Sequence, residues 1–487
     1  MYQLNFCQGY LFSMDDISGF LKHFPHQPTD KQLQLFEELH QFLKIKNQAN
    51  TFLIKGYAGT GKTSVVSSLI KNLPQYNLKY ILLAPTGRAA KVISQYTGRP
   101  ATTIHRKIYR KKSNENVNSE FGLGNNIHTD TVFIVDEASM ISDEGAIGAS
   151  FQFSNHGLLT DLCSYVYSVK KNNRIIFIGD TAQLPPVGTE LSPALSAEYL
   201  DLNFNLYVSQ IELTEVLRQQ QQSGILENAT RLRNLVNQDF FEQPVFITKN
   251  FKDTFRLNGD KLEDGLRYAY DKFGLENTLI LCRSNKKAIA FNQHIRNKIL
   301  NFDEEISVGD YLMVVKNNYF WLKEESEIGF IANGEIARIK KVKMIEELFG
   351  FRFANVLLEF IDYPNEPPLT CKIVLESLTA AAPALEPAQN KMFQSEISLQ
   401  YNHVKNKREK YKLLSEDSYY NALQVKFAYA VTCHKAQGGQ WDAVFIDQGY
   451  LTDEMLNSEL LRWLYTATSR AVQQLFYVNF GPEFFEQ

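Results

Sequence analysis

The chain has 487 residues, more than one hydrophobic core usually serves, so we expect two to four domains. Hydrophobic residues make up 44% and charged residues 22%, as in folded globular proteins, which excludes a largely disordered chain. The formal net charge of −3 excludes a surface coated in positive charge, but it allows nucleic-acid binding along a local basic groove.

The cysteines and the hydropathy pattern favour a reducing, aqueous compartment. Cysteines occur only at Cys7, Cys163, Cys282, Cys371 and Cys433, and none forms a CxxC pair, which argues against a zinc site or a disulfide framework. No apolar run approaches the ~18 residues of a membrane span, and the N-terminus has no basic stretch followed by an apolar one. We expect a soluble cytoplasmic protein without a membrane partner.

The first part of the chain has the pattern of a parallel α/β sheet. Four short apolar segments, at residues 51–54, 80–83, 132–135 and 175–178, alternate with helical stretches. They are continuous aliphatic and β-branched runs, as expected for strands buried on both faces. The residues that follow these strands should therefore lie at the functional edge of the sheet.

A second α/β unit and a β-rich insertion follow. Strands are predicted at residues 278–281, 427–431 and 444–446, with a helix at 460–468. Between residues 301 and 421 the pattern changes to alternating strands, which predicts a small inserted β domain. The strands predicted in the insertion are residues 311–315, 336–339 and 356–360.

Residues 56–63 match the motif GxxxxGK[ST] in full, directly after the first apolar segment and before a helix-like stretch. In such a loop, glycines let backbone N–H groups converge on phosphate oxygens at a helix N-terminus. Lys62 would add a point charge and Thr63 a hydroxyl ligand for Mg²⁺. The residues expected to bind ATP are Gly56, Ala58, Gly59, Thr60, Gly61, Lys62 and Thr63.

Two acidic residues, Asp136 and Glu137, follow the apolar segment 132–135. Asp136 is predicted to hold the water shell of Mg²⁺, and Glu137 to orient the attacking water. Adjacent acids elsewhere are usually a solvated turn, but these two emerge at the edge where the P-loop also lies. Gln183 follows the next strand and is a candidate to sense the γ-phosphate or its water. The pattern predicts hydrolysis rather than nucleotide binding alone.

P-loop enzymes often gain positive charge from an arginine of another domain, because it stabilises the phosphoryl oxygens in the transition state. Arg218 and Arg470 are the candidates. Taken alone, either arginine would be a surface ion pair. Their weight comes from the motifs in which they lie.

Eight motifs occur in order, at residues 56–63, 84–90, 102–105, 136–140, 179–187, 213–219, 432–438 and 465–471. Together they resemble the superfamily 1 helicases, and most closely superfamily 1B, the RecD-like and Dda-like branch. The resemblance covers most of the chain. It implies an α/β fold of two RecA-like P-loop domains that close over ATP, with Arg218 and Arg470 reaching from the second domain to the nucleotide.

The resemblance also implies small inserted subdomains, one of them β-rich and SH3-like, and a strand-separating pin at about residues 106–131. The predicted domains are an N-terminal helical segment with the adenine-recognition region (1–50), a first RecA-like domain (51–205), a second RecA-like domain (206–300 and 421–487) and the inserted SH3-like domain with a polar helical extension (301–420).

Several further residue roles are implied by the resemblance. Gln32, upstream of the P-loop, would recognise adenine. The residues implied to line a channel for single-stranded DNA are Thr86, His105, Thr432 and His434. Without the resemblance, the two histidines would be assigned structural roles.

Two features depart from the family pattern. Gln440 stands where family members commonly have a glutamate, which puts a charge-dependent role there in doubt. The polar stretch at residues 389–414 has no counterpart that we can place. It is either a solvated helix face, a site for a protein partner, or an extra DNA contact.

These observations predict a monomeric ATP-dependent DNA helicase, acting at single-stranded DNA and duplex junctions in DNA repair or recombination. The predicted direction, 5′ to 3′, rests on the resemblance alone. An RNA translocase is the nearest alternative, because backbone contacts distinguish DNA from RNA poorly. An ATPase subunit of a recombination or nuclease complex, without independent unwinding, is another. A small-molecule kinase or a GTPase shares the P-loop but needs no second α/β unit.

Overall fold

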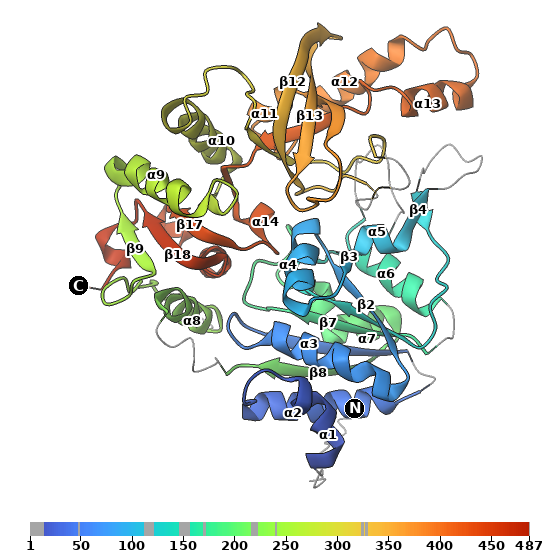
Figure 1. The fold of residues 1–487 in the computed structure, drawn as a ribbon, viewed down its shortest axis with the longest axis vertical. Coiled ribbons are helices and arrows are strands. Elements are labelled where there is room, and N and C mark those ends of the chain that lie inside the picture. The colour runs from blue at the N-terminus through green and yellow to red at the C-terminus, as the bar shows by residue number, and fades with distance from the viewer. Residues whose placement is uncertain are drawn as a thin grey trace.

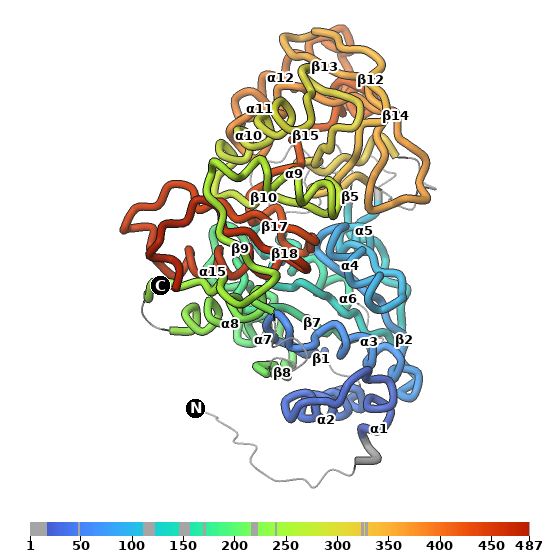
Figure 2. Tube along the Cα trace, turned by 60° about the vertical axis from the view of Figure 1, so that its left-hand side comes forward, coloured from blue at the N-terminus to red at the C-terminus, as the bar shows by residue number. Residues whose placement is uncertain are grey.

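The structure is a computed structural model of the chain. It describes residues 14–46, 49–111, 121–145, 156–168, 172–215, 223–238, 241–322, 326 and 330–486. Two parallel sheets lie beside each other, and a small barrel lies across the top of both (Figure 1). A view turned about the vertical axis shows the same arrangement (Figure 2). Within the described part of the chain, no helix is long and apolar enough to cross a membrane.

The first sheet has six parallel strands among the described residues, in the order β3-β2-β6-β7-β1-β8. These strands are β1 (Asn50–Gly56), β2 (Lys79–Ala84), β3 (Ala101–Thr103), β6 (Thr131–Val135), β7 (Arg174–Gly179) and β8 (Tyr207–Leu213). The parallel α/β sheet predicted from the apolar segments is confirmed.

Both faces of the first sheet are buried, which explains its continuous apolar strands. Phe52 and Ile54 of β1 face one core, and Leu53 faces the other. The first core is covered by α1 (Met14–His23), α2 (Asp30–Lys44), α3 (Lys62–Asn72) and α4 (Gly87–Thr97). The second is covered by α5 (Ile104–Ile108), α6 (Leu158–Tyr167) and α7 (Ala197–Phe204).

The second sheet is also parallel, with the order β16-β10-β17-β18-β9. Its strands are β9 (Thr254–Leu257), β10 (Thr278–Cys282), β16 (Ala430–Thr432), β17 (Trp441–Asp447) and β18 (Ala471–Val478). The helices of this unit include α8 (Gly224–Val236), α9 (Leu262–Phe273), α10 (Asn285–His294), α14 (Cys433–Ala436) and α15 (Ser458–Thr468). The chain thus has the two predicted parallel sheets flanked by helices.

A closed barrel is inserted between β10 and β16, and it fits the predicted SH3-like insertion. Its strands are β11 (Tyr311–Val314), β12 (Ile336–Leu348), β13 (Phe351–Phe360), β14 (Leu369–Val374) and β15 (Leu423–Phe427). The strand predicted at residues 427–431 is wrong in detail. Phe427 ends barrel strand β15, and β16 of the second sheet begins at Ala430, so the chain passes from barrel to sheet within this segment. The barrel therefore extends beyond the predicted domain boundary at residue 421.

Two smaller features belong to the inserted regions. The polar stretch at residues 389–414 forms two helices, α12 (Pro387–Leu399) and α13 (Lys407–Ser415), rather than one. Phe393, Ile397 and Leu414 pack them against Phe351 and Phe353 of the barrel.

Within the predicted pin, β4 (Tyr109–Lys111) pairs antiparallel with β5 (Phe121–Leu123). Residues 112–120, between these two strands, lie outside the described residues.

Candidate functional site

The P-loop connects β1 to α3 at the carboxyl end of the first sheet. Gly59 and Gly61 have φ angles of 78° and 81°, which only glycine adopts without strain, and Gly61 is the N-cap of α3. Lys62 Nζ donates hydrogen bonds to the carbonyl oxygens of Gly56 at 2.5 Å and Tyr57 at 2.9 Å. The loop therefore encircles the lysine ammonium at a helix N-terminus, which is the arrangement that binds phosphate.

The acidic pair lies beside this loop, at the end of β6. The Asp136 N–H donates to the Leu83 carbonyl at 2.9 Å. Burial, and to a smaller extent the neighbouring Glu137 carboxylate, raise the pKa of Asp136 to about 7 against the opposing effect of Lys62. A carboxyl held in these surroundings is stabilised as a carboxylate by a nearby cation, so Asp136 suits a place beside Mg²⁺. Glu137 has a φ of 52°, an uncommon conformation for a residue other than glycine.

Asp180 and Gln183 follow β7. Asp180 is fully buried, and it accepts hydrogen bonds from the Ala182 N–H at 3.0 Å and from the Tyr465 hydroxyl at 2.5 Å. Gln183 is also buried, and its Oε1 has no partner within the described part of the chain. Both residues, with Arg462, line a cavity of about 270 Å³. The assignment of Gln183 as a γ-phosphate sensor stays a prediction.

Arg470 lies between α15 and β18, and only 4% of its surface is exposed. Its guanidinium donates to the Thr466 carbonyl at 3.1 Å and to the Gly439 carbonyl at 3.2 Å. The Nη1 atom lies 4.0 Å from Glu137 Oε1. The second sheet thus brings Arg470 to the acidic pair of the first sheet. Arg218, the other predicted arginine, lies outside the described residues.

Helix α15 makes further contacts with the first sheet. The Tyr465 hydroxyl donates to Asp180 and accepts from the P-loop N–H of Ala58 at 3.0 Å. The Leu184 N–H donates to Thr466 Oγ1 at 2.8 Å, and Gln437 Nε2 donates to the Leu184 carbonyl at 2.7 Å. Tyr465, Thr466 and Gln437 were not among the predicted site residues. They lie within the predicted motifs, but no local signal shows which side chain faces the P-loop.

Gln32 of α2 lies directly behind the P-loop. Its Nε2 donates to the Thr60 carbonyl at 2.9 Å, and its Oε1 accepts from the Thr29 N–H at 3.0 Å in a capping box. Both polar ends of the side chain are therefore engaged within the protein. The adenine-recognition role of Gln32 stays a prediction.

Two of the residues predicted to contact DNA lie on the first sheet unit. Thr86 is the N-cap of α4, and its side chain accepts from the Ala89 N–H at 3.2 Å. His105 lies on α5, with its ring centroid 5.7 Å from that of Tyr109 and 6.5 Å from that of Phe330 of the barrel insertion. Burial lowers the pKa of His105 to about 4, so its imidazole is neutral at pH 7.

Thr432 and His434 lie on the second sheet unit, at the start of α14. Thr432 is the N-cap of this helix, and burial lowers the pKa of His434. The loop after α14 packs closely against the start of α4. A Cβ placed on Gly438 would lie only 3.2 Å from Thr86 Oγ1. The structure therefore brings Thr86 close to the motif that contains Thr432 and His434.

Gln440 also connects the two units. Its Oε1 accepts from the Tyr96 hydroxyl at 3.3 Å, and its carbonyl accepts from Arg88 Nη2 at 3.2 Å. Arg88 lies over the Trp441 ring, with its guanidinium carbon 4.1 Å from the ring centroid. An exposed neutral amide at this position thus joins α4 to the second sheet.

The described residues contain no group of three or more His, Cys, Asp or Glu side chains that could hold a metal ion by itself. Thr63, at the second position of α3, and Asp136 suit Mg²⁺, a cation that protein side chains usually bind together with phosphate oxygens. The predicted magnesium site is thus one that nucleotide would complete.

Comparison with known proteins identifies two domain families. Residues 41–189 match the AAA domain, and residues 427–478 match the UvrD-like helicase C-terminal domain. The first match includes the P-loop and the acidic pair. The second includes α14, α15 and Arg470.

Three relatives align with much of the chain. An uncharacterised protein of Acanthamoeba polyphaga mimivirus, R530, is 23% identical over 91% of this chain and 98% of its own length. The RecBCD enzyme subunit RecD of Buchnera aphidicola is 23% identical over 88% of this chain and 70% of its own. The ATP-dependent DNA helicase Dda of Enterobacteria phage T4 is 29% identical over 61% of this chain and 64% of its own.

These matches agree with the order of the motifs, since the first covers the P-loop and the acidic pair and the second covers the motif of Arg470. The chain belongs to the superfamily 1B helicases, in the branch of the RecD and Dda type.

Proposed function

We propose that the chain hydrolyses ATP at the contact between its two parallel sheets and thereby moves 5′ to 3′ along single-stranded DNA, separating duplex DNA ahead of it. The observation that carries the proposal is the approach of Arg470 Nη1, from the second sheet, to 4.0 Å from Glu137 Oε1 at the end of β6. A hydrolytic site assembled from two units responds to movement between them.

In this proposal, a few side chains share the catalytic roles in ATP hydrolysis. The P-loop N–H groups and Lys62 hold the phosphates, and Glu137 orients the attacking water. Arg470 adds positive charge beside the phosphoryl oxygens and so stabilises their negative charge in the transition state. Thr63 and Asp136 would hold Mg²⁺, which would supply positive charge against the phosphates. Arg218 would add to Arg470 from the same unit.

Helix α15 supports coupling between hydrolysis and movement. Arg462, Tyr465 and Thr466 are three and four residues apart, so they lie on one face of the helix. This face bonds to the loop that follows β7 and to the P-loop. A change at the phosphates therefore reaches the second sheet through direct hydrogen bonds. Because β8 belongs to the first sheet, the boundary predicted between residues 205 and 206 is wrong, and in this proposal the first motor domain extends from residue 51 to the end of β8 at Leu213. The second comprises the chain from α8 to residue 300, together with the chain after Phe427.

The path of DNA is proposed from the predicted contact residues. Thr86, His105, Thr432 and His434 come from both sheet units, and hydroxyl and imidazole groups can bond to backbone phosphates without reading sequence. The hairpin of β4 and β5 would separate the duplex strands. The 5′ to 3′ direction is supported only by the resemblance to the RecD-like and Dda-like branch.

The test is unwinding of matched duplexes that carry either a 5′ or a 3′ single-stranded tail, with the purified chain, ATP and Mg²⁺. We expect the 5′-tailed duplex to open and the 3′-tailed duplex to stay closed. Lys62→Ala should abolish both ATP hydrolysis and unwinding, because it removes the ammonium at the phosphates.

Each alternative gives a different result. Opening of only the 3′-tailed duplex would refute the direction. ATP turnover stimulated by RNA but not by DNA would identify an RNA motor. Turnover stimulated by DNA without strand separation would identify an ATPase subunit of a larger complex. Unwinding by Lys62→Ala would refute the assigned nucleotide site.

A further inference from the structure

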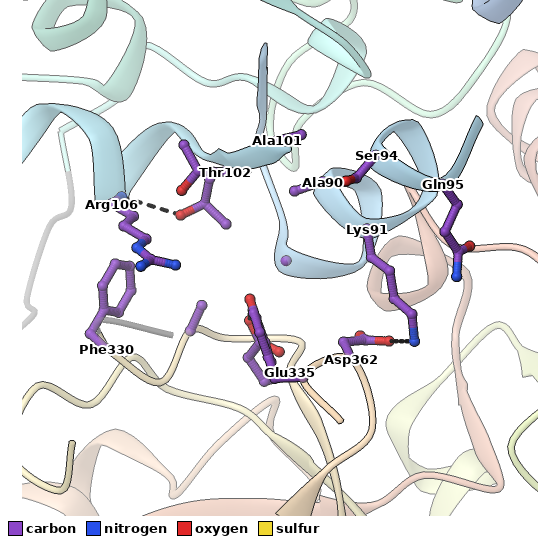
Figure 3. A pocket seen from close by; sticks show the side chains of 14 residues that line it. Ala90, Lys91, Ser94, Gln95, Ala101, Thr102, Arg106, Phe330, Glu335 and Asp362 are labelled. Atoms are coloured by element: carbon purple, nitrogen blue, oxygen red, sulfur yellow. Dashed lines mark hydrogen bonds and ion pairs between the residues drawn. The ribbon is translucent and has the colours of Figure 1, made fainter. Parts of the chain in front are cut away.

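A cavity of about 200 Å³ lies where the first sheet unit meets the barrel. Figure 3 shows its two walls, with α4 and α5 on one side and barrel residues on the other. The wall from the first sheet unit carries cations and hydroxyls, at Lys91, Thr102, Thr103 and Arg106. The barrel wall carries carboxyls, at Glu335 and Asp362. The first wall has the chemistry that binds a phosphate, and the second has the chemistry that repels one.

Glu335 lies against the start of α4. Gly87 is the first residue of this helix, and a Cβ placed on it would lie only 2.1 Å from Glu335 Oε1. The same oxygen accepts a hydrogen bond from the Tyr363 hydroxyl at 3.1 Å. The first N–H groups of a helix have no carbonyl partner within the helix, and they attract anions. The Glu335 carboxyl thus stands where a phosphate would approach α4, next to the predicted DNA contact Thr86.

The polar groups of this contact are incompletely paired. Glu335 is only 2% exposed, yet its Oε2 has no hydrogen-bond partner in the described part of the chain. The same is true of Asp362 Oδ2 and Thr102 Oγ1 on either side of the cavity. Asp362 Oδ1 does pair with Lys91 Nζ, at 2.8 Å. Buried oxygens without partners disfavour a contact, so this one is poised to open when a better partner arrives.

We propose that the Glu335 side chain is a plug that occupies a phosphate subsite of the DNA channel, so that single-stranded DNA enters only after the barrel withdraws from α4. This inference rests on the proposed function, because it assumes that the channel beside Thr86 binds DNA. The ligand class is a phosphodiester of the strand backbone. It would bind the start of α4, Lys91 and Thr102 in place of the carboxyls.

A plug of this kind lowers the apparent affinity for DNA. When only a fraction of the molecules is open, the measured dissociation constant is the intrinsic constant divided by that fraction. Shortening the Glu335 side chain should therefore tighten binding, although it removes no contact to DNA and adds none. A merely structural contact between barrel and α4 predicts the opposite, a loss of stability with no gain in affinity.

The test compares Glu335→Ala with the parent chain in binding a fluorescent oligothymidylate, followed by anisotropy without nucleotide. We expect Glu335→Ala to bind about ten-fold more tightly, mainly through faster association. Glu335→Gln keeps the shape of the plug and should bind no more tightly than the parent. The matched control is Glu359→Ala, which removes an exposed barrel carboxylate that pairs with Lys340 at 3.3 Å and should leave affinity unchanged.

The outcomes separate this inference from the proposed function. If the parent binds the strand and a folded Glu335→Ala binds no more tightly, the plug is refuted while DNA binding stands. If neither the parent nor any variant binds, the proposed function fails and the plug fails with it. If Glu335→Ala does not fold, Asp362→Asn, which weakens the pair with Lys91, serves instead. It should tighten binding in the same direction by a smaller factor, and unchanged affinity would again refute the plug.

Discussion

The first sheet unit contacts both the second sheet and the barrel, and the side chains that reach across these two contacts differ in their hydrogen bonding. Toward the second sheet, Tyr465, Thr466 and Gln437 all form hydrogen bonds across the contact. Toward the barrel, Glu335 and Asp362 each keep a buried oxygen unpaired among the described residues. Each such oxygen costs about 1–3 kcal/mol. The first contact is therefore built to transmit force and the second to open.

Buried oxygens without a hydrogen-bond partner also indicate where a ligand could bind within each contact. Gln183 Oε1 and Ser139 Oγ are buried oxygens without a partner in the described part of the chain, and both residues line the cavity that Asp180 and Arg462 also line. Thr102 Oγ1 is their counterpart at the predicted DNA channel. Unpaired buried groups in a folded protein usually await water, an ion or a ligand.

The largest expected effect concerns Arg470. Replacing it with alanine should lower kcat for ATP hydrolysis about 10³-fold or more, because the charge that reaches Glu137 from the second sheet is lost. The KM for ATP should change little, since the arginine acts on the transition state. Steady-state turnover with saturating single-stranded DNA measures both constants.

The matched control for Arg470 is Arg231→Ala. Arg231 lies on α8 of the same unit, and within the described part of the chain it forms surface ion pairs with Glu227 and Glu486. Turnover should remain at the parent level in this variant. A folded Arg470→Ala that keeps half the parent kcat would show that the contact between the sheets does not complete the catalytic site.

The next effect tests the pairing at Tyr465. Tyr465→Phe removes the hydroxyl shared by Asp180 and the Ala58 N–H, leaving a buried carboxyl and a buried N–H without that partner. We expect the free energy of unfolding to fall by about 1–3 kcal/mol, with a parallel loss of ATP turnover. Urea denaturation gives the first quantity. Tyr450→Phe, at an exposed side chain, is the control, and an unchanged urea midpoint for Tyr465→Phe would contradict the argument.

Much of this arrangement was predictable because its signals are local. The P-loop and the acidic pair are short motifs that directly follow continuous apolar strands. The motif predicts the chemistry, and the strand predicts its place at the edge of the sheet. The strands β3 and β8 were not predicted, because they are edge strands of the first sheet. Only one face of β8 is regularly buried, and β3 is three residues long, so neither shows a continuous apolar run.

The long-range contacts could not be predicted, because each joins residues far apart in the sequence. Asp180 with Tyr465, Gln32 with Thr60, and Gly87 with Glu335 carry no spacing that relates one partner to the other. Glu335 in particular lies in a short turn before β12, where an acidic residue would ordinarily be solvated. Its burial follows only from the position of the barrel over α4.

The pH dependence of DNA binding is the next prediction. Burial, and to a smaller extent the neighbouring Asp362, raise the pKa of Glu335 to about 8, while the Tyr363 hydroxyl and Lys91 oppose the rise. Arg106 faces the same cavity. A carboxyl withdrawn into solvent has its ordinary pKa of about 4.3. The closed contact therefore takes up a proton. The contact between Glu335 and α4 is therefore strongest below the pKa of the solvated carboxyl, and it weakens as the pH rises toward 8.

Between pH 6 and pH 8, the affinity of the parent chain for single-stranded DNA should rise relative to that of Glu335→Gln, by up to about ten-fold per pH unit. The Gln variant carries no titrating group at this position, so the ratio of the two affinities cancels the titration of other groups. Parallel pH profiles for the two proteins would show that Glu335 does not titrate with barrel closure.

The smallest effect concerns Gln32, whose two polar side-chain atoms both form hydrogen bonds within the protein. Its side chain bonds to Thr29 and to the Thr60 carbonyl of the P-loop, so Gln32→Ala should cost about 1 kcal/mol of stability through the lost cap. Because it acts through the loop, we expect the KM values for ATP and GTP to rise by the same factor. Gln34→Ala is the control, because Gln34 lies on the same helix and forms solvent-exposed hydrogen bonds with the side chains of Lys31 and Glu38. If the KM rises for ATP but not for GTP, Gln32 must leave Thr29 and Thr60 to bind adenine. A side chain with both polar ends paired would then exchange its partners when nucleotide binds.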